Sequence, residues 1–237
     1  MKHAVKTLCL ATLMVGLAFG ANAQFRQSVF LNGNLPTGNF SGDVNNNWNS
    51  VPLTHLQIGK LASAGFGLGY RASYRFDVGV GMVAPFAQAD FFWNFMKSDW
   101  SDKYTQAKAA AAPNYFNIPV LLGVSYLYDQ LWNDITPYGE FGVGADMFII
   151  TPERSKAFPH TYAYNPDLKM AWMIGLGAYF GRHVSVGVYY YGLGKHTIQY
   201  TNSTYKELTT LEQAAYDNGN VQTRTVGSLA IRIGFHF

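Results

Sequence analysis

Two histidines stand beside hydroxyl side chains, and such pairs can form the base and nucleophile of an acyl-transfer site. His183 is followed by Ser185, and His196 by Thr197. However, His183 falls at a short turn, and no serine stands beside His196 in a recognisable pattern. A lone histidine in a turn or strand is more often structural, so we predict no catalytic residue.

Cofactor and metal motifs are equally weak. A polar stretch from Asp43 alternates like the start of a calcium loop, but Trp48 stands where that loop needs glycine and Thr54 where it needs glutamate. Glycines at every second position of residues 65–69 belong to one strand face, whereas a phosphate cradle needs a strand-to-helix turn. The only cysteine, Cys9, lies in the N-terminal leader. We therefore predict no metal and no cofactor.

The charged residues that carry more information alternate with apolar ones. Such spacing places the charges on one face of a strand and the apolar residues on the other. The charges on the predicted inward faces or at their ends are Arg26, Arg71, Arg75, Asp77, Glu140, Asp146, Lys169, Arg224 and Arg232. We predict a charge network inside the barrel made of Arg71, Arg75, Glu140, Asp146, Arg224 and Arg232. Ions inside a narrow barrel must pair, because an unpaired buried charge costs several kcal/mol. We predict that at least one of Arg71 and Arg75 meets Glu140 or Asp146 across the lumen.

Residues 221–237 show the strand that positions such charges. Every second residue from Leu229 to Phe237 is apolar, and the residues between them are small, polar or charged. Residues 64–77 alternate just as clearly, with Leu68 in the apolar set and Gly67 in the inward set. One face therefore meets hydrocarbon and the other a polar interior, although a soluble sheet can show the same pattern.

The chain contains eight such segments. We predict strands at residues 25–34, 64–77, 78–93, 114–128, 135–150, 168–180, 184–199 and 221–237, with the faces of residues 78–93 unassigned. Long and short connections alternate between them, as in barrels whose long loops lie on one side of a membrane. Ten strands remain the alternative if residues 208–216 also pair.

Residues 1–23 have the layout of a secretory signal peptide. Two lysines precede an apolar run, and Ala21 and Ala23 mark a cleavage site. The apolar run is short of the ~20 residues that a membrane-spanning helix needs. We predict a cleaved leader and one barrel domain at residues 24–237.

Composition excludes several classes of protein. Losing Lys2 and Lys6 with the leader takes the formal net charge from +3 to +1, which is too close to neutral to indicate nucleic acid. Charged residues make up only 13% of the chain, whereas aromatic residues reach 16%. Few charges and many aromatic residues fit an all-β, antiparallel, up-and-down barrel that crosses a membrane with its strands.

The chain resembles the small outer-membrane β-barrel domain proteins of Gram-negative bacteria, the porin family. The resemblance rests on the final strand, on LPTGNF at residues 35–40 and on FNIP at residues 116–119. It implies an outer-membrane location with both termini in the periplasm, and contact with outer-membrane lipid. It also implies that the insertion machinery reads the final strand, with Phe235 and Phe237 as its signal.

Three functions follow from this reading. The first is a non-enzymatic, monomeric surface protein whose extracellular loops bind a ligand or support the envelope, with the interior charges as a plug. The second is a small porin for ions or small solutes. The third is an enzyme similar to the lipid A deacylase or palmitoyltransferase, but His183 lies at the wrong end of the barrel for outer-leaflet lipid.

Overall fold

The computed structural model describes residues 24–42, 62–97, 109–111, 113–128, 134–155, 161–202 and 221–237. The predicted leader at residues 1–23 and the alternative strand at residues 208–216 lie outside the described residues. No helix in the described ranges is long and apolar enough to cross a membrane.

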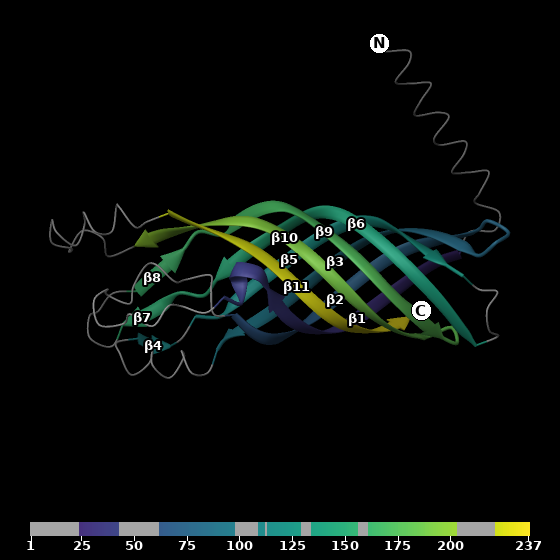
Figure 1. The fold of residues 1–237 in the computed structure, drawn as a ribbon, viewed down its shortest axis with the longest axis horizontal. Helices are drawn as coiled ribbons and strands as arrows, with labels where there is room; N and C mark the ends of the chain where they lie inside the picture. The colour runs from purple at the N-terminus through teal and green to yellow at the C-terminus, as the bar shows by residue number, and fades with distance from the viewer. Residues whose placement is uncertain are drawn as a thin grey trace, which may run out of the picture.

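Eight long antiparallel strands form the wall of a closed barrel (Figure 1). They are β1 (Gln24–Thr37), β2 (Ala62–Asp77), β3 (Met82–Met96), β5 (Tyr115–Leu127), β6 (Ile135–Ile150), β9 (Asp167–Phe180), β10 (Val184–Asn202) and β11 (Val221–His236). Each strand pairs with the next along this series, and β11 pairs with both β10 and β1. The last strand therefore closes the wall, and the prediction of an eight-stranded barrel is confirmed.

The strands form because their side chains alternate between two different surroundings. Outward side chains such as Leu68, Val120 and Ile174 are 51–55% exposed, whereas inward Arg71 is 3% exposed. The alternation predicted for residues 64–77 and 229–237 is present in β2 and β11, and Glu140 and Asp146 on β6 face inward as predicted. Apolar residues thus cover the outside of the barrel and polar residues line much of its inside.

The third strand begins later than predicted. Residues 78–81 form a turn, in which Gly79 and Gly81 have φ angles of 82° and 102°, and β3 starts at Met82. A positive φ is easily adopted only by residues without a Cβ. The structure also assigns the faces of this strand, and it places Gln88 and Asp90 inside the barrel.

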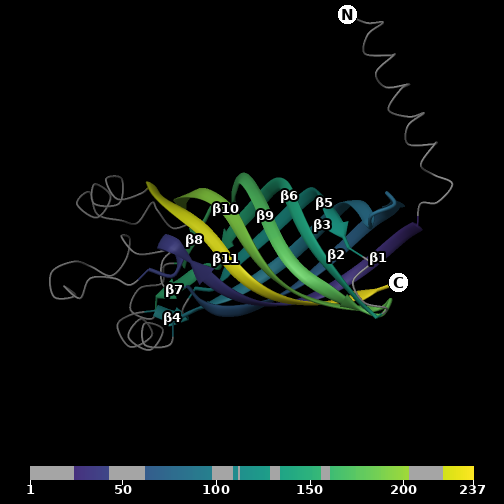
Figure 2. The ribbon, with the colours of Figure 1, turned by 45° about the vertical axis from the view of Figure 1, so that its right-hand side comes forward.

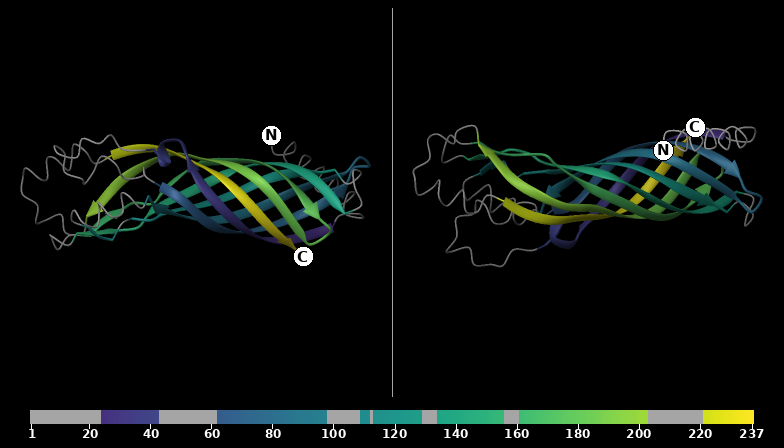
Figure 3. Two further views of the ribbon diagram at one scale, coloured as in Figure 1. Left: turned by 60° about the horizontal axis from the view of Figure 1, so that its bottom comes forward. Right: turned by 90° about the horizontal axis from the view of Figure 1, so that it is seen from above.

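The two ends of the barrel differ. The described turns at residues 78–81 and 181–183 and both ends of the described chain, Gln24 and Phe237, lie at one end, which we call the turn end (Figures 1 and 2). At the opposite loop end, the short strands β4 (Ala109–Ala111), β7 (Glu153–Ser155) and β8 (Thr161–Tyr164) continue the sheet from the tip of β10 (Figure 3). Two of these strands occupy residues 151–167, which we expected to be a loop.

A β-bulge interrupts β10 near the loop end. The pairing with β11 shifts register between Gly192 and Gly194, and Gly194 has a φ of 98°. The extra residue reverses the alternation, because Leu193 and His196 are both buried whereas Lys195 is exposed. The bulge therefore decides which side chains of this strand face the lumen.

Candidate functional site in the barrel interior

A buried ion pair crosses the lumen at mid-height. Arg71 on β2 donates to both carboxylate oxygens of Glu140 on β6, at 2.7 Å and 2.5 Å. Ser125 on the neighbouring β5 donates to the same carboxylate at 2.8 Å. Because β2 and β6 are not neighbours in the sheet, the pair spans the interior. A bidentate arginine–carboxylate pair is among the stronger hydrogen-bonded pairs in proteins.

A second ion pair lies beside the first. Arg232 on β11 approaches Asp90 on β3 at 3.3 Å and also lies 3.8 Å from Glu140. Its Nε donates to the side-chain oxygen of Asn32 at 2.9 Å. Arg232 is fully buried and Asp90 is 2% exposed. The two arginines and two carboxylates thus balance in charge.

Two polar side chains connect these pairs. Gln88 accepts from Arg71 at 2.8 Å and donates to Asp90 at 2.5 Å. Tyr191 donates to Asp90 at 3.0 Å and accepts a hydrogen bond from Arg232. We call the connected set the central charge network: Asn32, Arg71, Gln88, Asp90, Ser125, Glu140, Tyr191 and Arg232.

Aromatic rings cover the guanidinium groups of this network. Arg71 lies 4.0 Å from the ring centre of Phe86 and 5.0 Å from that of Phe30. Arg232 lies 4.2 Å from Phe30 and 4.1 Å from Tyr189. Rings in these positions attract the cations while excluding water. The network is therefore held in place by packing as well as by charge.

The interior at this height is filled. Arg232, Tyr191, Leu121 and Met173 have no exposed surface, and they come from four different strands. No water-sized space therefore touches these four side chains. An eight-stranded barrel is just wide enough for its own side chains to fill.

Asp146 joins a different cluster, nearer the loop end. Its carboxylate lies 3.1 Å from Nε2 of His196, whose Nδ1 lies 3.3 Å from Asp167. Lys169 lies 3.2 Å from the same Asp167. His196 faces the lumen only because of the bulge in β10. The same Nε2 lies closer, at 2.7 Å, to the backbone carbonyl of Leu193, so Asp146 lies beside a histidine without a well-formed hydrogen bond to it. None of the arginines of the predicted set reaches Asp146 among the described residues.

The other two predicted arginines lie at the two ends of the barrel. Arg75, near the turn end of β2, packs over the ring of Tyr179 at 4.7 Å. Arg224, in the loop-end half of β11, donates to the backbone carbonyl of Thr223 at 3.1 Å. Neither side chain contacts the central charge network in the part of the chain that the structure describes.

An apolar layer closes the interior at the loop end. The short 3-10 helix η2 (Gly38–Phe40) follows β1 and inserts Phe40, which is fully buried. Its ring lies 5.4 Å from Tyr115 and 5.7 Å from Phe148, both in edge-on contacts. We call this set the mouth layer: Phe40, Tyr115, Phe148, Ile150, Leu193, Ile198 and Val226.

The candidate histidine and hydroxyl pairs do not form an open site. Ser185 lies 2.8 Å from Nε2 of His236, not beside His183, and Ser28 lies 2.7 Å from the other ring nitrogen of His236. His236 and both serines are at most 2% exposed. A nucleophile must reach its substrate, so this arrangement suits a structural bridge between strands. His196 is likewise fully buried.

No group of three or more histidine, cysteine, aspartate or glutamate side chains in the described ranges could hold a metal ion.

The terminal aromatic residues both face outward, with Phe235 42% and Phe237 69% exposed. Backbone hydrogen bonds of 3.3 Å and 2.9 Å join Phe237 to Gln27 on β1. The final residue is thus part of the seam where the barrel closes.

Sequence reasoning missed five members of the central charge network: Asn32, Gln88, Asp90, Ser125 and Tyr191. Gln88 and Asp90 were missed because β3 carries aromatic residues on both faces, so hydropathy does not alternate along it. An aromatic residue such as Tyr191 is equally typical of the aromatic belts at membrane boundaries. Nothing in the sequence pairs Asn32 with Arg232, or Ser125 with Glu140.

No family model matches the sequence, and no curated protein matches it. Among solved structures, the fold is similar to Neisserial surface protein A, with a TM-score of 0.41 and 9% identity over 91% of this chain and 97% of the other. It is also similar to Ail, the attachment invasion locus protein of Yersinia pestis, with a TM-score of 0.43 and 10% identity over 91% of this chain and 99% of the other. A third similar structure is outer membrane protein OprG of Pseudomonas aeruginosa, with a TM-score of 0.43 and 11% identity over 91% of this chain and 95% of the other. At these scores the likeness carries no argument about function.

Proposed function

We propose that this protein is a non-enzymatic outer-membrane β-barrel that conducts no solutes and acts through its loop end. The observation that carries the proposal is the inside-out arrangement, with charges paired inside and apolar side chains exposed outside. A soluble protein would instead bury its apolar side chains and expose its charges.

The outer face supports a position across a membrane. The described outward positions of the eight wall strands carry one charged side chain, Lys195. Aromatic pairs flank this surface, with Phe66 and Trp93 5.4 Å apart toward the loop end and Phe25 and Tyr74 5.1 Å apart at the turn end. Paired aromatic girdles mark the two boundaries of transmembrane barrels.

The location has a direct test. The protein should fractionate with the outer membrane and migrate differently on mild-detergent gels before and after heating. Deleting Phe237 should impair assembly, because the insertion machinery is proposed to read the final strand. Recovery of the full chain as a soluble periplasmic protein would contradict the proposed location.

Conduction separates the plug from the alternative of a small porin. The filled interior supports the plug, since Arg232 and Tyr191 leave no surface exposed. The refolded protein in planar bilayers should therefore show no single-channel conductance. Steady ion-conducting steps from the parent protein would instead establish the porin.

The remaining role falls to the loop end. The strands β4, β7 and β8 extend the wall there, and this end would face the exterior if both termini lie in the periplasm. We propose that this end binds an extracellular ligand or partner and that the barrel works as a monomer. The buried positions of His196 and Ser185 favour this role over lipid-modifying catalysis.

A further inference from the structure

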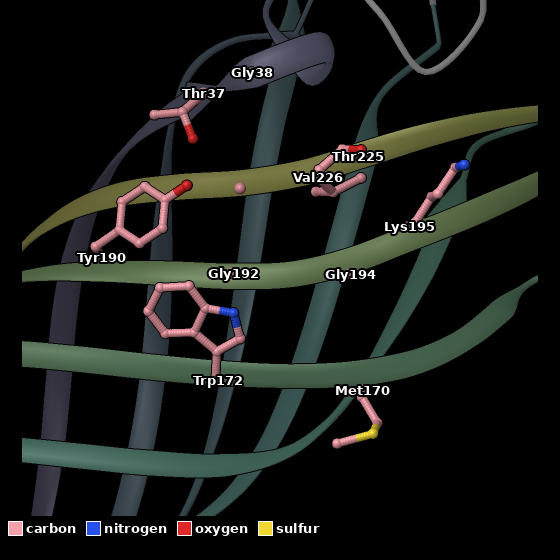
Figure 4. A pocket seen from close by; sticks show the side chains of 11 residues that line it. Thr37, Gly38, Met170, Trp172, Tyr190, Gly192, Gly194, Lys195, Thr225 and Val226 are labelled. Atoms are coloured by element: carbon pink, nitrogen blue, oxygen red, sulfur yellow. The ribbon is translucent and has the colours of Figure 1, made fainter.

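A groove of about 320 Å³ lies on the outer face of the barrel, beside the bulge of β10 (Figure 4). It crosses β9, β10 and β11 and reaches the end of β1. Figure 4 shows Trp172 and Tyr190 at its left end, and Met170 and Lys195 at its right. Thr37 and Thr225 complete its walls.

The groove exists because its floor lacks side chains. Gly192, Gly194 and Gly227 line it, and a Cβ at Gly192 would collide with the indole of Trp172. Gly194 also needs its positive φ for the bulge. The indole and the ring of Tyr190 lie 5.5 Å apart beside this floor. The result is an apolar trough with aromatic sides.

The groove lies at the upper edge of the apolar belt. On β11 the exposed residues from Phe235 to Leu229 are all apolar, whereas Thr225 and Thr223 follow toward the loop end. Trp172 and Tyr190 lie at this change, and such rings favour the level of lipid headgroups. One end of the groove would thus meet acyl chains and the other headgroups.

A single cation stands at the headgroup end. The bulge turns Lys195 outward, and it is the one charged side chain on the described outward positions of the wall. Lys169, on the neighbouring strand, pairs with Asp167 at 3.2 Å, whereas the described residues offer Lys195 no carboxylate within salt-bridge distance. None of the described residues thus occupies its charge, which a ligand in the groove could meet.

We propose that this groove binds a phosphorylated glycolipid of the outer leaflet, of the lipid A type. An acyl chain lies along Met170 and Trp172, and a phosphate on the sugar meets the ammonium group of Lys195. This inference rests on the proposed outer-membrane location, which puts an anionic, phosphate-bearing lipid at this level. An uncharged lipid would leave the cation without a partner.

The test is native mass spectrometry of the detergent-solubilised full chain with diphosphorylated lipid A, and with lipid A from which the phosphates have been removed. The parent protein should retain the phosphorylated form preferentially. Lys195→Gln should weaken this binding roughly fivefold, since one cation near a lipid surface contributes about 1 kcal/mol. Lys195→Arg should preserve it.

Arg182→Gln is the matched control, because it removes the same charge from the exposed turn at the opposite end. The proposal is overturned if both lipid forms bind equally, or if Lys195→Gln has no more effect than Arg182→Gln. It is also overturned if inorganic phosphate, at a concentration similar to that of the lipid, displaces the lipid. If one of these outcomes is observed while the protein still fractionates with the outer membrane, the lipid site is wrong but the proposed function stands.

Discussion

The inner face of the barrel wall carries buried, paired charges, whereas the outer face is apolar and almost free of charge among the described residues. Strand β2 shows both faces. Arg71 is buried and contacts a carboxylate and two rings, whereas Leu68, three residues away, is half exposed on the outer face. In this fold the polar interior is the tightly packed region. Specific contacts therefore concentrate inside, while the outer face needs only to remain apolar.

The mouth layer is an exception to this arrangement. There the interior is apolar, and Phe40 enters it from η2 rather than from a wall strand. The central charge network is thus built from wall strands, whereas the mouth layer also includes Phe40 from the short 3-10 helix η2. The interior therefore has two packed layers of different kinds.

The largest expected effect comes from breaking the central charge network. Glu140→Ala leaves Arg71 buried without its carboxylate and removes the second acidic neighbour of Arg232. We expect the free energy of unfolding to fall by about 3–5 kcal/mol. Urea unfolding of the barrel in lipid bilayers measures this change.

A double-mutant cycle supplies the control for that experiment. Because Arg71→Met removes the other charge, the double variant should lose much less stability than the sum of the two single changes. A coupling near zero, together with a measurable conductance of the parent protein, would show that water fills the lumen.

The outer face gives the next largest effect. Leu68→Arg should cost roughly 2–4 kcal/mol, because it places a charge on the lipid-facing side near mid-membrane. Val120→Arg and Ile174→Arg should behave similarly. If Leu68→Arg proved harmless while Leu68→Ala was costly, this face would be a protein core, and the contrast between the two faces would be lost.

The mouth should respond less than the middle. Phe40→Ala should lower stability by less than the ~3–5 kcal/mol of a phenylalanine deleted from a core, because a short cap can detach locally. If the central charge network is the proposed plug, this variant should not create conductance. Channel openings from Phe40→Ala alone would show that the mouth layer is the true barrier.

Arg75 should give the smallest effect, and it sharpens the comparison with Arg71. Both lie on the inward face of β2, four residues apart, but Arg75 contacts only the ring of Tyr179 in the described structure. Arg75→Ala should therefore cost about 0.5–1 kcal/mol, typical of an exposed cation–ring contact. If Arg75→Ala lowered the free energy of unfolding as much as Glu140→Ala does, water would be excluded from the turn end as fully as from the middle of the barrel.

Much of the wall could be predicted from the sequence, because a strand between lipid and a polar interior must alternate. The two faces of β11 and β2 and the inward positions of Arg71 and Glu140 follow from that rule alone. Their contact was also predictable, since the narrow interior offers a buried arginine few other anionic partners.

The rule fails where inward residues are apolar or where the alternation is interrupted. In β3 the inward Phe86 and Phe92 are larger and more apolar than the outward Ala87 and Ala89, so Asp90 could not be assigned a face. In β10 the bulge at Gly194 adds one residue and brings His196 inside. Both cases depend on three-dimensional packing that a linear pattern does not record.

The contact between Arg71 and Glu140 also has a kinetic consequence. The two residues lie 69 positions apart on strands separated by β3 and β5. The pair can form only after those strands have assembled, so it contributes late in folding. Interactions absent from the folding transition state slow unfolding without speeding folding. The ion pair should therefore lower the unfolding rate and so lengthen the lifetime of the assembled barrel.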